Sequence, residues 1–436
     1  MARLGLARPD ARAWAMYDWA NSGVYTLVVT AVFPIFFASF ASADKTLATS
    51  RFTLATTLGL TIAAVFSPIL GTLADKSAAK LRFLAAFVAL GVVGVGGMFF
   101  IQQGAWFFAL GCFMLVTIGI NGSFVFYDAL LPHVASLEEA DRLSSAGYGL
   151  GYLGGGLVLA LGLAMIQLPG LFGFPTGPDL TPAQASLPTR AGFLLAAGWW
   201  VVFSIPLFRR IPEPPTASGS SGPAGPNVLK ETFAQLGRTF HDLRKYRDAF
   251  LFLLAFLIYN DGIGTIIKLA TIYGTEVGIG PTTMIAAIVV TQFVGVPFAF
   301  MFGSLAGRIG TRNAIFTGIA AYVGITFLGF FMRTDLHFLM LAVLVGMVQG
   351  GTQALSRSLF SAMIPKHKSG EFFGFFSVFD KGASILGPLV FWLILELTGS
   401  SRNAILSLVV FFAVGALLLA SVNVERGKAA ALADTA

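Results

Sequence analysis

Long apolar runs separated by short polar segments fill most of the chain. Most runs exceed 18 residues, which predicts membrane-spanning helices rather than buried strands. Six runs precede a polar interruption in the middle of the sequence, and six follow it. The pattern predicts an all-α membrane protein of two six-helix bundles, residues 1–208 and 249–436, joined by a cytoplasmic segment at 209–248. The runs lie at roughly 14–40, 51–74, 81–101, 105–131, 143–167, 191–208, 249–275, 282–306, 313–332, 335–363, 372–397 and 402–423.

The first apolar run admits a second interpretation, as a secretory signal. Three arginines precede it, and the small residues Ala41, Ser42 and Ala43 follow it. A signal core, however, has only about 7–15 apolar residues. This run is nearly twice as long and contains Asp18 and Asn21. We therefore expect a permanent membrane helix.

Composition and charge agree with a bilayer environment. Hydrophobic residues make up 56% of the chain and charged residues 11%, with a mean hydropathy of +0.80, which is too apolar for a surface that faces water. Of the 28 Lys and Arg residues, 20 lie on segments that share a side with the N-terminus and five on the opposite side. This bias predicts that both termini are cytoplasmic. It also accounts for the net charge of +7 without a nucleic-acid partner.

The segment between the halves has two parts. Residues 211–227 are rich in Pro, Gly and Ser and are typical of a flexible linker. The apolar positions that follow alternate at spacings of four and three among basic residues, which predicts an amphipathic helix on the lipids of the cytoplasmic leaflet. A solvated connector is the alternative. The apolar positions are Leu229, Phe233, Leu236, Phe240 and Leu243.

Several predicted spans contain ionisable residues. Such a residue costs about 2.5–3.5 kcal/mol at the centre of a membrane helix, so it normally faces the interior of a bundle. Four of the five helices that carry one are the first, fourth, seventh and tenth, which begin successive three-helix units; the fifth is the eleventh helix. The residues are Asp18, Asp128, Asp261, Lys268, Arg357 and Lys381.

Polar side chains share helix faces with these charges or lie beside them. We expect the combined set to line a hydrated pathway for a substrate or ion near the midplane. The polar partners are Asn21 and Tyr25 on helix one, Asn121 and Tyr127 on helix four, Asn260 on helix seven, and Gln349 and Gln353 on helix ten.

The depth of these charges suggests a gate. Asp18 and Asp128 lie near the cytoplasmic side, and we expect them to meet Arg357 or Lys381 across the interface between the halves. The alternative is a static ion pair that only aids packing. Asp18 or Asp261 is also a candidate carrier of a coupling proton, if burial favours its neutral form.

The two halves repeat one cytoplasmic turn. Gly71-Thr-Leu-Ala-Asp75-Lys76 ends the second helix, and Gly303-Ser-Leu-Ala-Gly307-Arg308 ends the eighth. We expect both turns to act as gating loops. Asp75 is placed to accept hydrogen bonds from the N-terminus of a neighbouring helix, although a plain loop carboxylate with little effect is the alternative.

Motifs for other chemistry are weak. Gly149-x-Gly151-x-x-Gly154 matches a dinucleotide fingerprint by letter, but it lies within an apolar helix, where the required strand and βαβ unit are missing. The four histidines are scattered and Cys112 is the single cysteine. We find no nucleophile–base pair, no metal-ligand spacing and no phosphate-binding loop, so we predict no enzyme activity, no cofactor and no metal.

The cytoplasmic turns resemble the hallmark loop of the major facilitator superfamily, G-x-L-a-D-R/K-x-G-R-K/R. Gly71, Leu73, Asp75, Lys76 and Lys80 match it, but Ala78 and Ala79 depart from it. The second copy has Gly307 in place of the aspartate. The resemblance implies a twelve-helix fold that works by alternating access.

Longer segments are similar to the unknown-major-facilitator family, which includes autophagy-related vacuolar amino-acid effluxers. This resemblance implies transport activity, and amino-acid efflux is known for part of the family. We expect a secondary active transporter of small polar solutes, with amino acids as the favoured solutes and a proton as the candidate coupling ion. We also expect a monomer in the cell (inner) membrane. An exporter of organic ions or drugs, and a non-transporting scaffold or receptor, are the alternatives. The matching segments are Met16–Ser22, Phe126–Pro132, Tyr259–Gly262 and Gly350–Ser358, followed by Phe372–Gly374, Lys381 and Gly387-Pro388.

Overall fold

The computed structural model describes residues 4–42, 45–216, 245–383 and 386–434, together with residues 232, 234 and 237. The predicted amphipathic helix, with all five of its apolar positions, and the linker from residue 217 onward lie outside the described residues.

The first half consists of six long helical segments. Each is long and apolar enough to cross a bilayer. In chain order the elements are α1 (Pro9–Val24), η2 (Tyr25–Val32), α2 (Phe33–Phe36), η3 (Phe37–Ala41), α3 (Lys45–Ser77), α4 (Lys80–Gly97), η4 (Met98–Phe100), α5 (Trp106–Ala129), α6 (Leu131–Val134), α7 (Ala140–Gln167), η5 (Pro169–Phe172), α8 (Pro182–Ala185) and α9 (Leu187–Arg210).

The second half repeats this plan and adds a short helix at its end. In chain order its elements are α11 (Arg247–Val277), α12 (Pro281–Ile309), α13 (Thr311–Phe330), α14 (Asp335–Ala362), η7 (Lys366–Lys368), α15 (Ser369–Gly382), α16 (Leu386–Thr398), α17 (Ser401–Ser407), α18 (Val409–Ala420) and α19 (Val424–Ala433).

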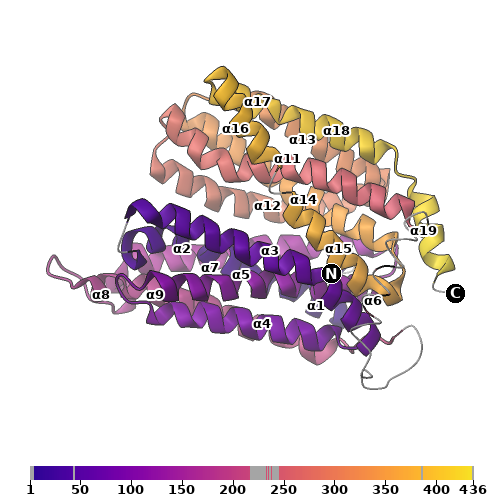
Figure 1. Ribbon diagram of the computed structural model, residues 1–436, viewed down its shortest axis with the longest axis horizontal. Helices are drawn as coiled ribbons and strands as arrows, with labels where there is room; N and C mark the ends of the chain where they lie inside the picture. The colour runs from indigo at the N-terminus through magenta and orange to yellow at the C-terminus, as the bar shows by residue number, and fades with distance from the viewer. Residues whose placement is uncertain are drawn as a thin grey trace.

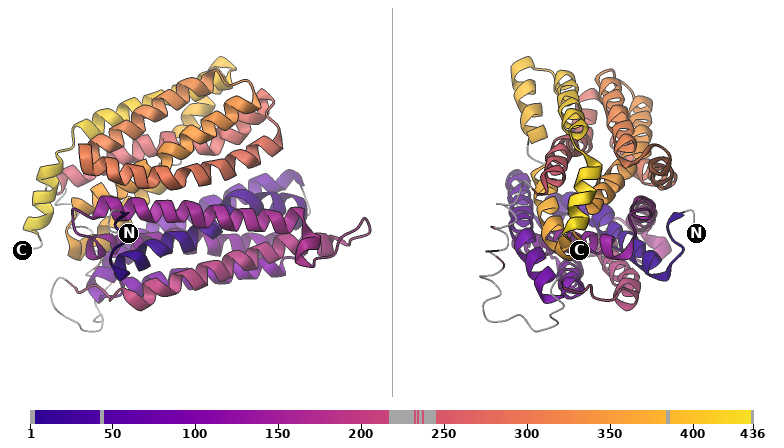
Figure 2. Two further views of the ribbon diagram at one scale, coloured as in Figure 1. Left: turned by 180° about the vertical axis from the view of Figure 1, so that it is seen from behind. Right: turned by 90° about the vertical axis from the view of Figure 1, so that its right-hand side faces the viewer.

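The predicted all-α architecture is confirmed. The described residues contain twelve helices that are long and apolar enough to span a membrane, and among those residues there is no strand. The two halves form two bundles, stacked one above the other in Figure 1 and again in the reverse view of Figure 2. Both chain ends lie at the same end of the molecule, which we call the termini end. The charge bias predicts that this end faces the cytoplasm.

Two spans differ from the uniform helices that the apolar pattern predicts. The run at 372–397 is not one helix, because α15 ends at Gly382 and α16 begins at Leu386. Gly387 and Pro388 lie in the first turn of α16, where proline is tolerated because its missing N–H would have no partner in the helix. The first span widens into π-helical turns from Tyr25 to Val32 and again near its end. Such turns inside α-helices often mark functional sites.

Helices from opposite halves pack against each other along two seams. In one seam α3 of the first half lies against α15 of the second, and in the other α7 lies against both α12 and α14. The buried apolar residues form separate clusters in the two halves of the chain. One cluster lies between residues 6 and 211, and two others lie almost entirely between residues 246 and 422. The seams also bring polar and charged residues of the two bundles into contact.

Candidate functional site

Arg357 of α14 joins the two bundles near the termini end. Its Nη1 donates a hydrogen bond of 3.0 Å to Asp128 of α5, and its Nη2 donates one of 3.1 Å to Asp18 of α1. The arginine is only 2% exposed. The structure therefore places three of the predicted pathway residues in one buried ion-pair cluster, which we call the Arg357 cluster.

Two further donors and the flat faces of the guanidinium are also engaged. Nε donates to the Ser144 hydroxyl at 2.9 Å, and Nη2 also donates to the Ser144 carbonyl at 3.1 Å. The rings of Trp14 and Tyr148 lie 4.7 Å from the guanidinium carbon, and that of Tyr127 lies 5.4 Å away. A planar cation with five donors suits such a site, where a lysine could satisfy only part of it. Ser144, Trp14 and Tyr148 were not predicted, because no pattern in the sequence distinguishes them.

Tyr127 and Gly147 fix the position of the Asp18 carboxylate. The Tyr127 hydroxyl donates to Asp18 Oδ2 at 2.8 Å, and the indole of Trp14 donates to the Tyr127 carbonyl at 3.0 Å. Gly147 of α7 lies directly against the same carboxylate, so that a Cβ there would overlap Asp18 Oδ2. Glycine at 147 therefore leaves the space that the acid occupies.

The Arg357 cluster carries an excess negative charge when both acids are ionised. Two carboxylates, Asp18 and Asp128, share one guanidinium. Each acid is less than one-tenth exposed, so the unbalanced charge is poorly solvated. Uptake of one proton by the pair would make the cluster neutral.

A second contact between the bundles involves Asp75 at the end of α3. Its two carboxylate oxygens accept hydrogen bonds from the backbone N–H groups of Gly370 at 3.0 Å and Glu371 at 2.8 Å, in the first turn of α15. Lys80 completes the site with an ion pair of 2.6 Å. An anion at a helix N-terminus is favoured by the helix dipole and the free N–H groups. Gly71 lies on the backbone of Gly370, where a Cβ would clash.

The repeated turn in the second half makes a different contact. Gly303 packs closely on Ser145 of α7, and Arg308 is exposed. Next to this turn, Asp141 of α7 accepts hydrogen bonds of 2.6 Å from the hydroxyls of both Thr311 and Ser358. Asp141 was not among the predicted residues, although an aspartate at the start of an apolar run is a detectable signal.

Lys381 does not join the Arg357 cluster. It forms an ion pair of 2.5 Å with its neighbour Asp380 on α15. Asn260 of α11 donates to the other oxygen of Asp380 at 3.0 Å, and Gln353 of α14 donates to the Asn260 carbonyl oxygen at 3.4 Å. Sequence reasoning missed Asp380, although the cost of burying charge in a membrane applies to it as it does to Lys381.

Asp261 is separate from both groups. It is fully buried and accepts a hydrogen bond of 2.8 Å from the backbone N–H of Gly387, in the first turn of α16, and a longer one of 3.4 Å from Thr265. It therefore caps the second half of the interrupted helix. Lys268 lies further along α11 and is exposed, so the charges that were predicted to line one pathway are divided into distinct groups.

The other predicted pathway residues differ in exposure. Asn21 is buried at 1% exposure, and Asn121 donates to the Thr117 carbonyl of its own helix at 2.7 Å. Tyr25 is 51% exposed. Gln349 is half-buried on α14, and Lys76 is half-buried at the end of α3.

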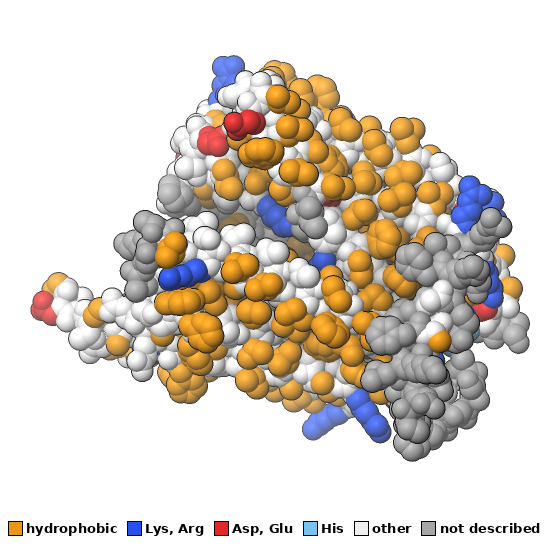
Figure 3. Space-filling view, viewed as in Figure 1, with side chains coloured by type: hydrophobic (Ala, Val, Ile, Leu, Met, Phe, Trp, Pro, Cys, Tyr) orange, Lys and Arg blue, Asp and Glu red, His pale blue; other side chains and the backbone are white. Residues whose placement is uncertain are grey.

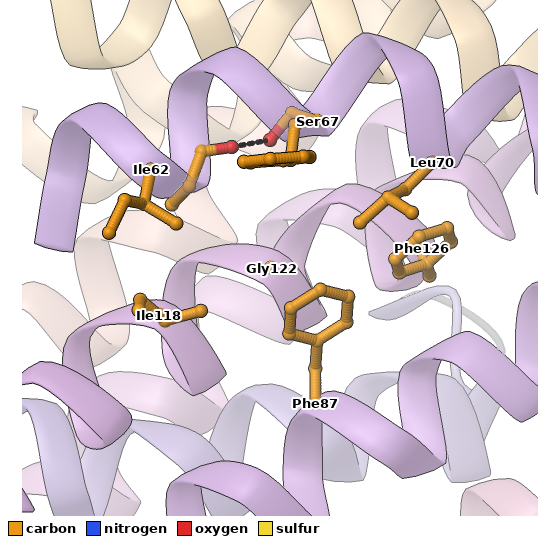
Figure 4. A pocket seen from close by; sticks show the side chains of 9 residues that line it. Ile62, Ser67, Leu70, Phe87, Ile118, Gly122 and Phe126 are labelled. Atoms are coloured by element: carbon orange, nitrogen blue, oxygen red, sulfur yellow. Dashed lines mark hydrogen bonds between the residues drawn. The ribbon is translucent and has the colours of Figure 1, made fainter.

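A hollow between the bundles is visible away from the termini end, with Lys or Arg side chains inside it (Figure 3). A second cavity, of about 130 Å³, lies within the first bundle between α3, α4 and α5. Its lining is apolar apart from Ser67, and Ile62, Leu70, Phe87 and Phe126 surround it (Figure 4). That cavity has no charged group to bind a polar solute. No group of three or more His, Cys, Asp or Glu within the described part of the chain could hold a metal ion.

Comparisons with known proteins agree with this geometry. Residues 45–432 match the family described as "Vacuole effluxer Atg22 like". The chain belongs to this Atg22-like family. A relative in Bacillus subtilis, called an uncharacterized MFS-type transporter YxiO, is 38% identical over 95% of this chain and 94% of its own length. Autophagy-related protein 22-1 of Aspergillus niger is 28% identical over 68% of this chain, a match that spans 49% of the fungal protein.

Solved structures show the same fold. FucP, a major facilitator superfamily transporter crystallised in the outward conformation, aligns with a TM-score of 0.70 at 13% identity, over 96% of this chain and 99% of that one. The human organic anion transporter MFSD10 aligns with a TM-score of 0.69 at 14% identity, over 94% and 99%. The resemblance to the major facilitator superfamily is thereby confirmed. This Atg22-like chain is a multi-pass membrane transporter of that type, and its family and fold are not those of an enzyme.

Proposed function

We propose that this Atg22-like protein is a secondary active transporter of small polar solutes in the cell (inner) membrane, and that amino acids are its favoured solutes. The observation that carries the proposal is the Arg357 cluster, which ties helices of both bundles together at the termini end. In the same molecule, charged groups near the middle of the spans remain partly exposed. A closed end and an open middle are what one state of an alternating-access carrier requires.

The Arg357 cluster acts as a gate in this proposal. Rocking of the bundles must break the contacts of Arg357 with Asp18 and Asp128, and the contact of Asp75 with α15. Breaking buried ion pairs is costly, so the closed end persists until solute or proton binding offsets part of the cost. A static cluster that only aids packing would hold the same geometry but would not need to open during transport.

A coupling proton fits the charge count of this gate. One proton on the Asp18–Asp128 pair removes the excess negative charge and weakens the attraction for Arg357. Asp261 is a less suitable carrier, because its carboxylate caps α16 within the second bundle, so that a proton there would weaken no contact between the bundles. We propose that solute movement is linked to a proton at the Arg357 cluster.

Transport in proteoliposomes tests the proposal. The purified chain should accumulate at least one of the twenty proteinogenic L-amino acids, and an imposed proton gradient should raise the accumulated amount. Accumulation of organic ions but no amino acid would favour the drug-exporter alternative. Deletion of residues 211–227 tests the remaining alternative, a non-transporting scaffold or receptor. A transporter should keep most of its flux after this deletion, whereas a scaffold that acts through this segment should lose its activity.

A further inference from the structure

Two spans are irregular near their middle. Tyr25 is the middle residue of the span Pro9–Ala41 and begins its π-helical part. Lys381 lies near the middle of the span Lys366–Thr398, at the point where α15 ends. Asp380 and Lys381 lie within electrostatic range of Tyr25, which belongs to the other bundle. Interrupted helices at the midplane are where transporters bind their solutes.

Asp380 is held in a fixed orientation at this point. Asn260 of α11 donates to its Oδ1, and Gln353 of α14 in turn donates to Asn260. Two other helices therefore support a carboxylate that the membrane would otherwise disfavour. The second oxygen, Oδ2, contacts only the ammonium of Lys381 among the described residues.

The Asp380–Lys381 pair is open to a ligand. The Asp380 side chain is 32% exposed and that of Lys381 is 17% exposed, whereas the side chains of the Arg357 cluster are nearly or fully buried. Partial exposure lowers the cost of desolvating the two charges and leaves both accessible to a solute. Lys268, exposed on α11, adds a second cation within electrostatic range of both residues.

We infer that Asp380 binds the ammonium group of a zwitterionic solute and that Lys381 binds its carboxylate. This inference rests on the proposed transport of amino acids and names the residues that recognise them. The ammonium of Lys381 occupies Oδ2 in the empty site, and the ammonium of the solute replaces it there. The released lysine then pairs with the carboxylate of the solute, aided by Lys268. Because a neutral zwitterion enters and no ion leaves, the net charge of the site does not change.

The first test uses the unmodified protein and solute analogues. The amino acid that is transported best in proteoliposomes is compared with its N-acetyl derivative, which lacks the ammonium, and with the amine that lacks the carboxylate. Each analogue should compete at least about tenfold more weakly, since each loses one charge-assisted contact. Equal competition by the N-acetyl derivative would overturn the inference without reference to any variant.

Two variants then assign the contacts. Asp380→Asn should lose the discrimination against the N-acetyl derivative, and Lys381→Gln should lose the discrimination against the amine. Glu396→Gln, at an exposed carboxylate on α16, is the matched control and should keep both. Asp380→Glu should recover the preference for the free ammonium, which separates recognition from a folding defect.

The outcomes distinguish this inference from the proposed function. If Asp380→Asn transports amino acids with unchanged discrimination, Asp380 is not the ammonium site but the transporter assignment stands. If the unmodified protein transports no amino acid at all, both the inference and the amino-acid proposal fail.

Discussion

Arg357 of α14 and Asp128 of α5 lie in different bundles, yet their side chains form a 3.0 Å ion pair in a site that is closed to solvent. Few contacts in the molecule depend so directly on the relative position of the two halves. If the bundles rock, this pair must separate.

A double-mutant cycle tests whether the pair is a gate. Arg357→Gln should reduce transport strongly, because it leaves two buried carboxylates without their cation, a loss of about 3–5 kcal/mol for a buried pair. Asp128→Asn should have a smaller effect, because Asp18 still pairs with Arg357. The double variant should transport better than Arg357→Gln alone, because only Asp18 then remains without its cation. The control cycle combines Asp128→Asn with Arg426→Gln. Arg426 lies on α19 and pairs with Asp248, so the effects of these two substitutions should be additive. Additive losses for the Asp128–Arg357 cycle itself would argue against a gate.

Gly147→Ala should disturb the same cluster without changing its charge. The new methyl group would overlap the Asp18 carboxylate, and overpacking of this kind costs about 1–3 kcal/mol. We expect slower transport and a lower melting temperature in detergent. Gly198→Ala on α9, where a Cβ would meet nothing within 4 Å, serves as the control and should be neutral or slightly stabilising. Equal behaviour of the two variants would mean that Asp18 has room to move.

Asp75→Asn should loosen the second contact between the bundles. The amide is neutral, so the buried Lys80 ammonium and the first turn of α15 both lose their anion. A cysteine placed at Ser377, in a Cys112→Ala background, should then react faster with a thiol reagent, because Ser377 faces Ser67 across this seam. Adding Lys80→Met should restore part of the protection, since it removes the unpaired charge.

Asp335→Asn is a matched control for that experiment. Asp335 also accepts a backbone N–H, from Gly280, but both residues belong to the second half. Its loss should leave the reactivity at position 377 unchanged.

Proton coupling should depend on Asp18 more than on Asp261. Asp18→Asn should abolish accumulation driven by a proton gradient and leave solute exchange between the two sides measurable, because the excess charge of the Arg357 cluster is gone. Asp261→Asn keeps an oxygen that can accept the Gly387 N–H, so it should lower stability and retain proton-driven accumulation. The reverse result would indicate that Asp261, which caps α16, carries the coupling proton.

The C-terminal helix α19 should remain attached to the bundle at mildly acidic pH. Burial alone would raise the pKa of the Asp434 carboxyl, but hydrogen bonds from Lys245, Lys368 and Tyr246 outweigh burial and hold this pKa well below its usual range. Because the pKa is lower in the folded state, the stabilisation is present above the unfolded value of about 3.9 and is lost only as the pH falls below it.

Hydrogen–deuterium exchange of residues 424–433, corrected for intrinsic rates, measures this attachment. Protection should be equal at pH 5 and pH 8, and Asp434→Asn should reduce it at both. Glu425→Gln, which removes only an exposed pair with Lys428 on the same helix, should have almost no effect. A loss of protection between pH 8 and pH 5 in the unmodified protein would show that Asp434 is not the group that holds the helix.

The sequence by itself determined the twelve spans and most of the charged groups between the bundles. Both follow from a local cost, since apolar length and buried charge can be evaluated one segment at a time. The same reasoning anticipated the contact of Asp75 with a helix N-terminus, because its position at a helix end is visible in the chain.

Only the tertiary structure decided which charges meet. It placed Arg357 rather than Lys381 between Asp18 and Asp128, showed Asp261 as a helix cap, and divided the charges that were predicted to line one pathway into separate groups. It also revealed Asp380 and Asp141, which pair with residues on other helices. Helix rotation and the close approach allowed by small residues such as Gly147 set these contacts, and neither follows from the spacing of residues within a single helix.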